Sequence, residues 1–381
     1  MAANNANFAV LFEATAFLHY FKEMPDHRQQ GKVAYPLNEI LLLCLLAVVA
    51  GAETFTEIAR FGQAKIALLR KFLPFENGAP AHDHLGDIFA ALDAEAFQRC
   101  FVAWVAALTH TSREVIAIDG KTSRRSGHKK DAKGPIHMVS AFAARQRLVL
   151  GQVKVNEKSN EIVAILALLD MMEIEGAVVT MDPMGCQRAI AEKVLGKKAD
   201  YIFALKGNQG TLHDDVKLFV TEQKAKNFVD AKLSRFETVD GDHGRIETRR
   251  YMVIHDVQWL RRRHDWPGLQ SVIIVDSTRE IGGKIERETR LYISSLDLVA
   301  EAVAPMVRAH WAIENSLHWV MDMIFRDDEC RVRKDNAPAN FATIKHMACN
   351  LPRRAPGKDS MNVRRKTAAW NDDYLASLLT A

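Results

Sequence analysis

Two short apolar segments each end in an aspartate, and this pattern constrains the fold more than any other feature of the chain. Residues 115–119 and 177–182 are rich in small and β-branched side chains and end in Asp119 and Asp182. Such runs predict buried strands. Because α/β sheets build their sites where strands end, we expect both carboxylates to face a functional crevice. The alternative is that each aspartate only opens a turn.

The neighbouring pattern predicts a mixed α/β sheet with helices on its faces. The short connection at 144–147 indicates a hairpin, and the strands after it alternate with helices. Hairpin strands followed by crossover units are typical of mixed sheets. The further strands are expected at 136–143, 148–155 and 201–205, and the helices at 161–172 and 187–195.

The chain divides into regions of different character. Residues 1–112 predict a helical N-terminal domain, because apolar residues recur there with helical spacing. An α/β core comprises residues 113–210 and 297–352, and residues 211–296 between its two parts predict a β-rich insertion. Residues 353–381 predict a basic, partly mobile C-terminal tail.

Composition excludes several classes of protein. The 381 residues are 48% hydrophobic and 26% charged, with 51 Lys and Arg against 47 Asp and Glu, which is the profile of a globular chain. Five scattered cysteines form no Cys-x-x-Cys pair, so a disulfide framework is not expected. The longest apolar run, residues 40–50, is shorter than the about 20 residues that cross a bilayer. With no signal peptide in the pattern, we expect a cytoplasmic protein.

A third acid comes from a helical segment late in the chain. Residues 308–322 predict a helix with one apolar stripe, and His310, Glu314 and His318 follow at intervals of four on a neighbouring stripe. One alternative is a surface helix with solvated charges. Another is a zinc face made by these three side chains, although their spacing matches no known zinc signature.

Three carboxylates without a cysteine cluster favour a hard, oxygen-preferring ion. Asp119, Asp182 and Glu314 would suit Mg²⁺ or Mn²⁺. Two such ions can clamp the attacking and leaving oxygens of a phosphodiester displacement. Basic residues greatly outnumber acids between 121 and 158 and between 331 and 366. Basic surface beside a carboxylate cluster suits a polyanionic substrate, although each run alone could be a solvated loop.

Seven short stretches together match one family, although none is specific alone. They are IAIDGK (116–121), HMVSAF (137–142), NEKSNEI (156–162), TMDPMGCQ (180–187), LKGNQ (205–209), HGRIETR (243–249) and HWAIENSLHW (310–319). With these, the sequence resembles the DDE-class insertion-sequence transposases of the H-repeat-associated type over most of its length.

The resemblance implies a ribonuclease-H-like core in which Asp119, Asp182 and Glu314 are the catalytic, metal-binding triad. It implies an enzyme that uses two Mg²⁺ (or Mn²⁺) ions to cleave DNA at the ends of an insertion sequence and to join the strand to target DNA. Its partners would be double-stranded DNA, with the N-terminal domain as the candidate reader of the repeats, and a second copy of the chain in a synaptic complex. The expected DNA and phosphate contacts are Lys121, Lys158, His310, Arg124 and Arg125.

The sequence departs from the family pattern at two places. Related transposases often carry Tyr, Arg and Lys around the third acid, where this chain has Val307, His310 and Met321. Pro183 follows the second acid where Ala is expected, and proline fixes φ and removes a donor. A ribonuclease-H-like nuclease without strand transfer, and a catalytically decayed DNA-binding relic, therefore stay open as alternatives.

Three other side chains near these motifs have weaker signals. We expect Trp311 and Trp319 to belong to the core rather than to stack on bases. His137 either lines the site or is a satisfied core histidine.

Overall fold

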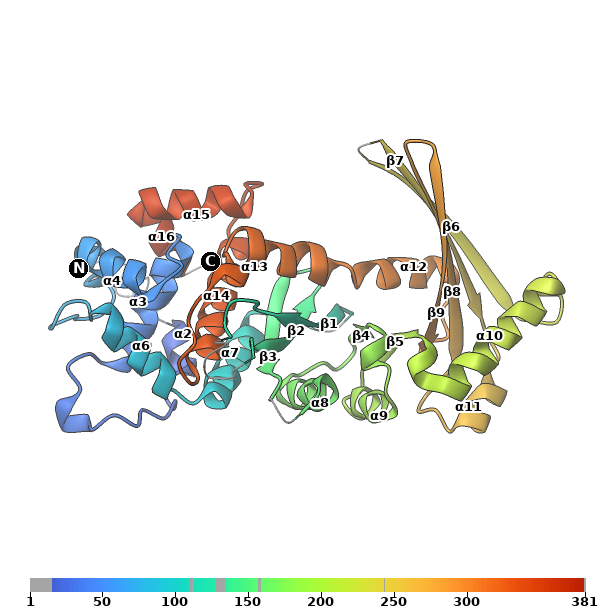
Figure 1. The fold of residues 1–381 in the computed structure, drawn as a ribbon, viewed down its shortest axis with the longest axis horizontal. Helices are drawn as coiled ribbons and strands as arrows, with labels where there is room; N and C mark the ends of the chain where they lie inside the picture. The colour runs from blue at the N-terminus through green and yellow to red at the C-terminus, as the bar shows by residue number, and fades with distance from the viewer. Residues whose placement is uncertain are drawn as a thin grey trace, which may run out of the picture.

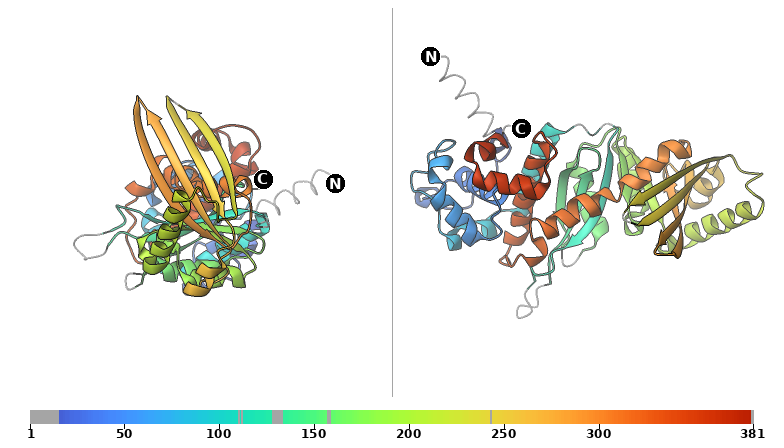
Figure 2. Two further views of the ribbon diagram at one scale, coloured as in Figure 1. Left: turned by 90° about the vertical axis from the view of Figure 1, so that its right-hand side faces the viewer. Right: turned by 90° about the horizontal axis from the view of Figure 1, so that it is seen from above.

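The structure, a computed structural model, describes residues 16–379 apart from 110, 112, 128–133, 157, 158 and 243. The molecule is elongated (Figure 1). A helical region forms one end, a sheet flanked by helices lies in the middle, and long strands form the other end. The two further views in Figure 2 show the same succession.

The described part of the N-terminal region is helical, as predicted. The apolar helix α3 is buried from Glu39 onwards, and α4 begins with a capping box made by Thr54 and Glu57. The predicted helix from Phe8 falls largely outside the described residues. No described helix combines the length and apolarity that crossing a membrane requires. The α-helices are α2 (Ala16–Tyr20), α3 (Leu37–Val49), α4 (Phe55–Ala64), α5 (Ile66–Leu69), α6 (His82–Ala91) and α7 (Ala94–Leu108).

One nine-stranded sheet runs through the rest of the molecule, in the order β3-β2-β1-β4-β5-β9-β8-β7-β6. The strands β1, β2 and β3 pair antiparallel, whereas β1, β4 and β5 pair parallel. This arrangement of the first five strands is that of a ribonuclease-H-like core, which confirms the predicted fold class. The core strands are β1 (Val115–Thr122), β2 (His137–Ala143), β3 (Leu148–Lys154), β4 (Val178–Met181) and β5 (Asp200–Leu205).

Helices cover both faces of this core. The helices α8 (Glu161–Met171) and α9 (Arg188–Gly196) lie together on one side of the strands in Figure 1, and α12 (Ala300–Ala309) and α13 (Trp319–Met323) lie on the other. The long helix α14 (Ala337–Arg354) is buried as far as Pro352 and packs against α3, α6, α7 and β3, so it joins the core to the helical region.

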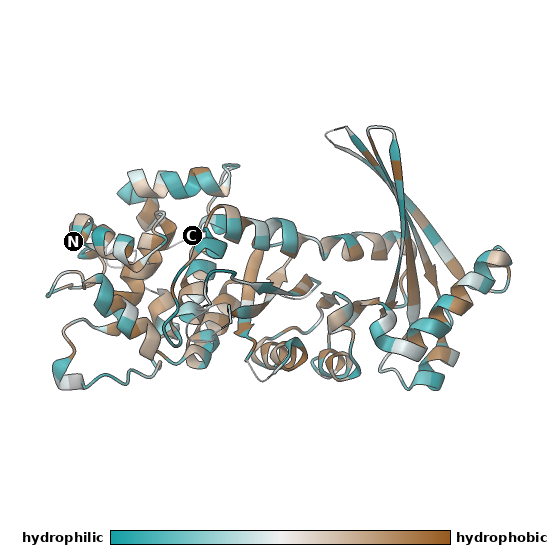
Figure 3. Cartoon of the chain, viewed as in Figure 1, coloured by the Kyte–Doolittle hydropathy of each residue, from teal (hydrophilic) through white to brown (hydrophobic). Residues whose placement is uncertain are grey.

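The insertion extends the core sheet rather than forming a separate one, because β9 pairs with β5. Gly282 and Gly283 have φ of 55° and 78° in the turn between β8 and β9, a conformation that favours glycine. Toward their outer ends, the strands β6 to β9 carry hydrophilic residues interspersed with hydrophobic ones (Figure 3). The elements are α10 (Gly210–Ala225), β6 (Leu233–Asp242), β7 (Arg245–Ile254), α11 (Gln258–His264), β8 (Ser271–Ile281) and β9 (Lys284–Ser294).

The segment after α14 is helical, which differs from the tail expected there. The helix α15 (Met361–Trp370) begins at a Ser360 cap, and α16 (Asp372–Ser377) follows it. Arg365 on α15 is buried and donates to carbonyls at the ends of α3 and α13. A basic side chain that binds the carbonyls of buried helix ends looks the same in the sequence as an exposed one. For this reason the basic composition suggested a solvated tail.

Candidate functional site

The two aspartates lie side by side at one edge of the parallel part of the sheet. The paired residues Ile118 and Met181 are the last of the β1–β4 ladder, and Asp119 and Asp182 come next. The prediction that the first strand ends at Asp119 is wrong, because antiparallel pairing with β2 carries β1 on to Thr122. Asp119 therefore projects from a strand and not from a loop.

Asp182 is held in place by the backbone that follows it. Its Oδ1 accepts hydrogen bonds from the N–H groups of Met184 and Gly185, at 3.0 and 3.2 Å. Pro183 is the first residue of this short turn, a position where a missing N–H costs no hydrogen bond. The unexpected proline therefore fits the local structure.

Glu314 lies in a turn of π-helix, Ile313–His318, between α12 and α13. The Trp319 N–H donates to the Glu314 carbonyl, five residues back. The sequence predicted an uninterrupted α-helix here, because side-chain periodicity does not reveal one widened turn. Such π-turns inside helices are frequent at functional sites.

The carboxylates of Asp119 and Glu314 converge with the imidazole of His318. Each side chain offers one atom, and these atoms lie within 4.8 Å of one another. The His318 Nδ1 is 3.6 Å from Asp119 Oδ2 and 3.5 Å from Glu314 Oε2. Asp119 and His318 are mostly buried, whereas half of the Glu314 side chain is exposed. We call these three residues the Asp119 cluster. Glu314 thus meets the first aspartate from the π-turn that packs against β1.

The electrostatics of this cluster show carboxylates that repel one another. Burial, together with the neighbouring carboxylates of Glu314 and Asp182, raises the pKa of Asp119 to about 8. The hydrogen bond with His318 is the main reason why the pKa of Glu314 is lowered to about 2. A divalent cation would remove the repulsion between the carboxylates. Two carboxylates and one imidazole, open to solvent on the Glu314 side, are a donor set that fits Mn²⁺ or Mg²⁺.

His310 has a different environment from His318. Its Nδ1 lies 3.1 Å from the Thr180 hydroxyl on β4, and burial lowers its pKa. It does not belong to the Asp119 cluster. The zinc face of His310, Glu314 and His318 is therefore not formed as one group, and contact of His310 with phosphate stays a prediction.

Lys121 lies in a second group of acids rather than in open solvent. Its Nζ is 2.6 Å from Asp322, 3.4 Å from Asp328 and 3.7 Å from Asp327. Asp327 also pairs with Lys345, at 2.9 Å. We call these five residues the lysine-bridged cluster. It ties β1 to the segment after α13, so contact of Lys121 with phosphate also stays a prediction.

The remaining predicted contacts lie beyond β1. Arg124 is largely exposed and lies 3.3 Å from Asp328, and Arg125 is exposed beside it. Lys158 lies outside the described residues. His137 is satisfied: it bonds to Thr122 and Glu161 and lies over Gly120. Because side chains alternate along a strand, this is the face of β1 opposite to Asp119.

A groove lined by arginines borders the helix that carries Glu314. It has a volume of about 680 Å³ and lies between α12 and the insertion strands. We call it the insertion groove. Trp311 lines this groove and is 36% exposed, and Trp319 on α13 is 55% exposed. The expectation that both belong to the core is therefore wrong. Arg290 stacks on the Trp311 ring at 4.8 Å. The groove is lined by Arg245, Arg249, Arg279, Arg287, Arg290 and Arg308.

Sequence reasoning placed His318 beside Glu314 only in the zinc alternative and did not group it with Asp119, and it missed the lysine-bridged cluster. His318 carries a usable signal, because a residue four positions after Glu314 lies on the same helix face. Asp327 and Lys345 carry none, because charged residues of this kind are usually exposed.

Residues 110–351 match the family described as "Transposase DDE domain", and residues 18–105 match "DDE_Tnp_1-associated". The chain therefore belongs to the DDE transposases, a family of phosphoryl-transfer enzymes, as the resemblance predicted. Among its relatives are two Escherichia coli proteins. The "H repeat-associated putative transposase YhhI" of strain K12 is 38% identical over 96% of this chain and 98% of its own. The "Putative transposase YncI" of strain O157:H7 is 40% identical over 96% of this chain and 95% of its own.

A piggyBac transposase, solved as a synaptic complex with hairpin DNA, aligns with a TM-score of 0.43 and 10% identity. The alignment covers 97% of this chain and 78% of that one.

Proposed function

We propose that this chain is an active transposase that cleaves DNA at the ends of an insertion sequence and joins the freed 3′-hydroxyl to target DNA. The observation that carries the proposal is the convergence of Asp119, Glu314 and His318 beside Asp182. These side chains come from three distant parts of the sequence. Membership of the DDE transposases supports the same reading.

In this proposal Asp119, Asp182 and Glu314 hold two Mg²⁺ or Mn²⁺ ions. Bound ions of this kind activate water or a 3′-hydroxyl and stabilise the departing oxyanion. The backbone N–H groups that hold Asp182 fix one carboxylate, and His318 orients the carboxylate of Glu314. Arg124 and Arg125 are exposed cations that follow β1 in the chain, and they are proposed to contact phosphate.

Two features of the site support an intact rather than a decayed transposase. All three acids are present, and the Pro183 turn keeps both hydrogen bonds to Asp182. His310, which replaces the usual arginine, is proposed to position Thr180 and β4 in addition to any contact with phosphate. Because two DNA ends must be held together, we propose that a homodimer is the active form.

The test uses purified full-length protein, Mg²⁺ or Mn²⁺, and DNA that carries the element's terminal repeats with their flanks. Strand-transfer products are expected, and Asp119→Ala should abolish them while the protein stays folded. A matched control is Asp83→Ala, which removes an exposed acid in the helical region. Cleavage without joining would favour the nuclease, and DNA binding without cleavage would favour the relic.

A further inference from the structure

A second groove borders the Glu314 turn on the side opposite to the insertion groove. It has a volume of about 1020 Å³, and we call it the C-terminal groove. Asn315, the residue after Glu314, lines both grooves. The two grooves therefore meet beside Glu314. The exposed residues of the C-terminal groove used below are Trp319, Lys358, Lys366 and Trp370.

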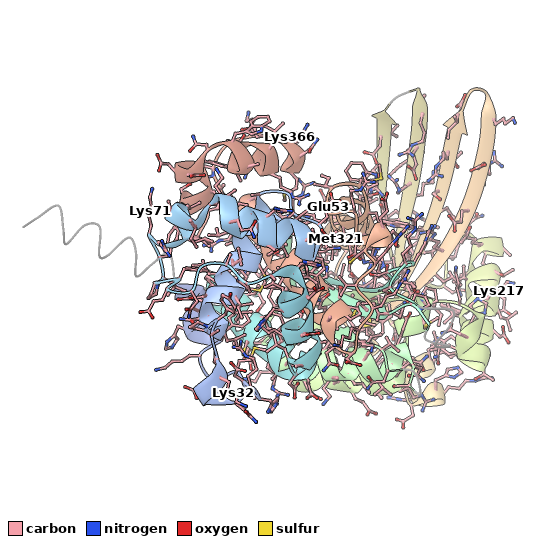
Figure 4. The ribbon with its side chains drawn as sticks, turned by 60° about the vertical axis from the view of Figure 1, so that its left-hand side comes forward. Lys32, Glu53, Lys71, Lys217, Met321 and Lys366 are labelled. Carbon is pink, nitrogen blue, oxygen red and sulfur yellow. The ribbon has the colours of Figure 1, made fainter. Side chains whose placement is uncertain are left out.

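The C-terminal groove is strongly cationic. Its lining contains seven Lys and Arg side chains but only two acids, Glu53 and Asp359. Figure 4 labels Glu53 and Lys366 in this part of the molecule, with Lys366 on α15. Such a surface is complementary to a polyanion.

Three arginines of the lining that are buried or partly buried add to the positive charge of the groove. Arg353, Arg364 and Arg365 donate to main-chain carbonyls. None of the three forms a salt bridge with a carboxylate among the described residues. Carbonyl partners satisfy most of these donors, although the buried Arg365 Nε has no partner, and they do not cancel the positive charge. A phosphate chain in the groove would therefore compensate charges that the fold leaves unpaired.

Two exposed tryptophans distinguish this groove from the insertion groove. Trp319 is 55% exposed and Trp370 is 76% exposed, and both line the C-terminal groove. By contrast, Arg290 already covers Trp311 in the insertion groove. Open indole faces in a basic groove are stacking platforms for unpaired bases, whereas bases within a duplex are stacked on each other.

We propose that the C-terminal groove binds a single strand of DNA, with bases stacked on Trp319 and Trp370 and phosphates facing Lys358 and Lys366. The inference rests on the proposed function, because the strand would be the one that continues from the phosphodiester at Glu314. It predicts that the C-terminal groove distinguishes an unpaired strand from a duplex.

The test uses fluorescence anisotropy to measure how tightly a fluorescent oligothymidylate binds to the full-length protein in EDTA. Trp319→Ala and Trp370→Ala should each weaken binding by about 5- to 150-fold, the usual contribution of one base–aromatic stack. The matched control is Trp259→Ala, since Trp259 is 40% exposed but lies on α11 in the insertion. A duplex of the same length should lose little affinity in the same variants.

Photocrosslinking of the unmutated protein provides a measurement that does not depend on folding of variants. An oligonucleotide with 5-iodouracil should crosslink to peptides that contain Trp319 or Trp370. Crosslinks confined to other peptides would overturn the proposal, as would unchanged single-strand affinity in both variants. A changed oligomeric state of Trp370→Ala with unchanged DNA binding would also overturn it, because the groove would then hold a second copy.

The outcomes separate the two proposals. Single-strand binding through these tryptophans without cleavage of element ends would leave the groove standing and contradict the proposed function. Cleavage and joining of element ends, with single-strand binding that does not depend on the tryptophans, would support the proposed function and contradict the groove proposal.

Discussion

Two groups of carboxylates lie next to each other beside β1, and their charges are balanced in different ways. Asp119 and Lys121 are two residues apart, so their side chains leave the same face of the strand. Around Asp119, the carboxylates of Glu314 and Asp182 form no ion pair with Lys or Arg among the described residues, and their basic neighbours are the imidazoles of His318 and His310. Around Lys121, by contrast, three acids share two lysines.

The difference shows in the ionisation of each group. Burial raises the pKa of Asp119, and its acidic neighbours raise it further. Burial would raise the pKa of Asp327 as well, but Lys345 and Lys121 hold it well below its usual value. The lysine-bridged cluster therefore carries its own cations, whereas the Asp119 cluster has no Lys or Arg ion pair among the described residues and is proposed to bind a cation from solution.

The largest expected effect is on activity at the Asp119 cluster. Asp119→Asn should lower DNA cleavage on the order of 10³-fold, because a metal ligand and its charge are lost. Its free energy of unfolding should not fall, since the substitution removes repulsion between carboxylates. Cleavage assays and urea denaturation measure both quantities. If Asp119→Asn lost stability but retained cleavage, the Asp119 cluster would stabilise the fold and would not be the catalytic site.

The second effect is on stability at the lysine-bridged cluster. Lys345→Met should lower the free energy of unfolding by about 3–5 kcal/mol, because Asp327 stays buried without its partner. The double variant with Asp327→Leu should recover much of this loss. Urea denaturation of the three proteins measures it. An unchanged midpoint for Lys345→Met would mean that the pair does not hold the fold.

The same cluster should give the protein an acid-sensitive stability. Because the folded pKa of Asp327 is below its unfolded value of about 3.9, its contribution is present above that pH and is lost as the pH falls further. The stability difference between the unmutated protein and Asp327→Asn should therefore be large at neutral pH and shrink in acid. A difference that is independent of pH would contradict the assigned ion pairs.

A smaller effect is expected for metal affinity at His318. His318→Ala should weaken Mn²⁺ binding by about 10- to 100-fold, because the imidazole either binds the ion or orients Glu314. Isothermal titration calorimetry measures this without DNA. His82→Ala, which removes an exposed histidine in the helical region, is the control. Equal affinity in both variants would exclude His318 from the site.

The smallest effects belong to the exposed cations after β1. Arg124→Ala and Arg125→Ala should each weaken DNA binding a few-fold and lower the slope of log affinity against log salt by about 1. Lys217→Ala, which removes an exposed cation on α10, should leave both unchanged. Binding isotherms at several salt concentrations distinguish these outcomes.

The sequence predicted the sheet well, because its strands have a clear period and end at turn residues. It also predicted that the edge after Ile118 and Met181 carries two aspartates. It could not predict that β1 continues past Asp119, since pairing with β2 is a property of two distant segments.

The helical segment after the insertion shows where such prediction stops. Apolar spacing indicated a helix around Glu314 but not the π-turn, and it assigned Trp319 to the core although more than half of its side chain is exposed. The burial of Lys345 and Arg365 could not be foreseen either, because charged side chains are usually exposed and no local pattern marks their partners Asp327 and Val48.

Anomalous diffraction from crystals of the full-length protein soaked in Mn²⁺ tests the central claim most directly. We predict an anomalous peak bounded by Asp119, Glu314 and His318, with Asp182 beside it, and no peak among Asp322, Asp327 and Asp328. A peak only in the lysine-bridged cluster, or none beside Asp119 at saturating Mn²⁺, would contradict it.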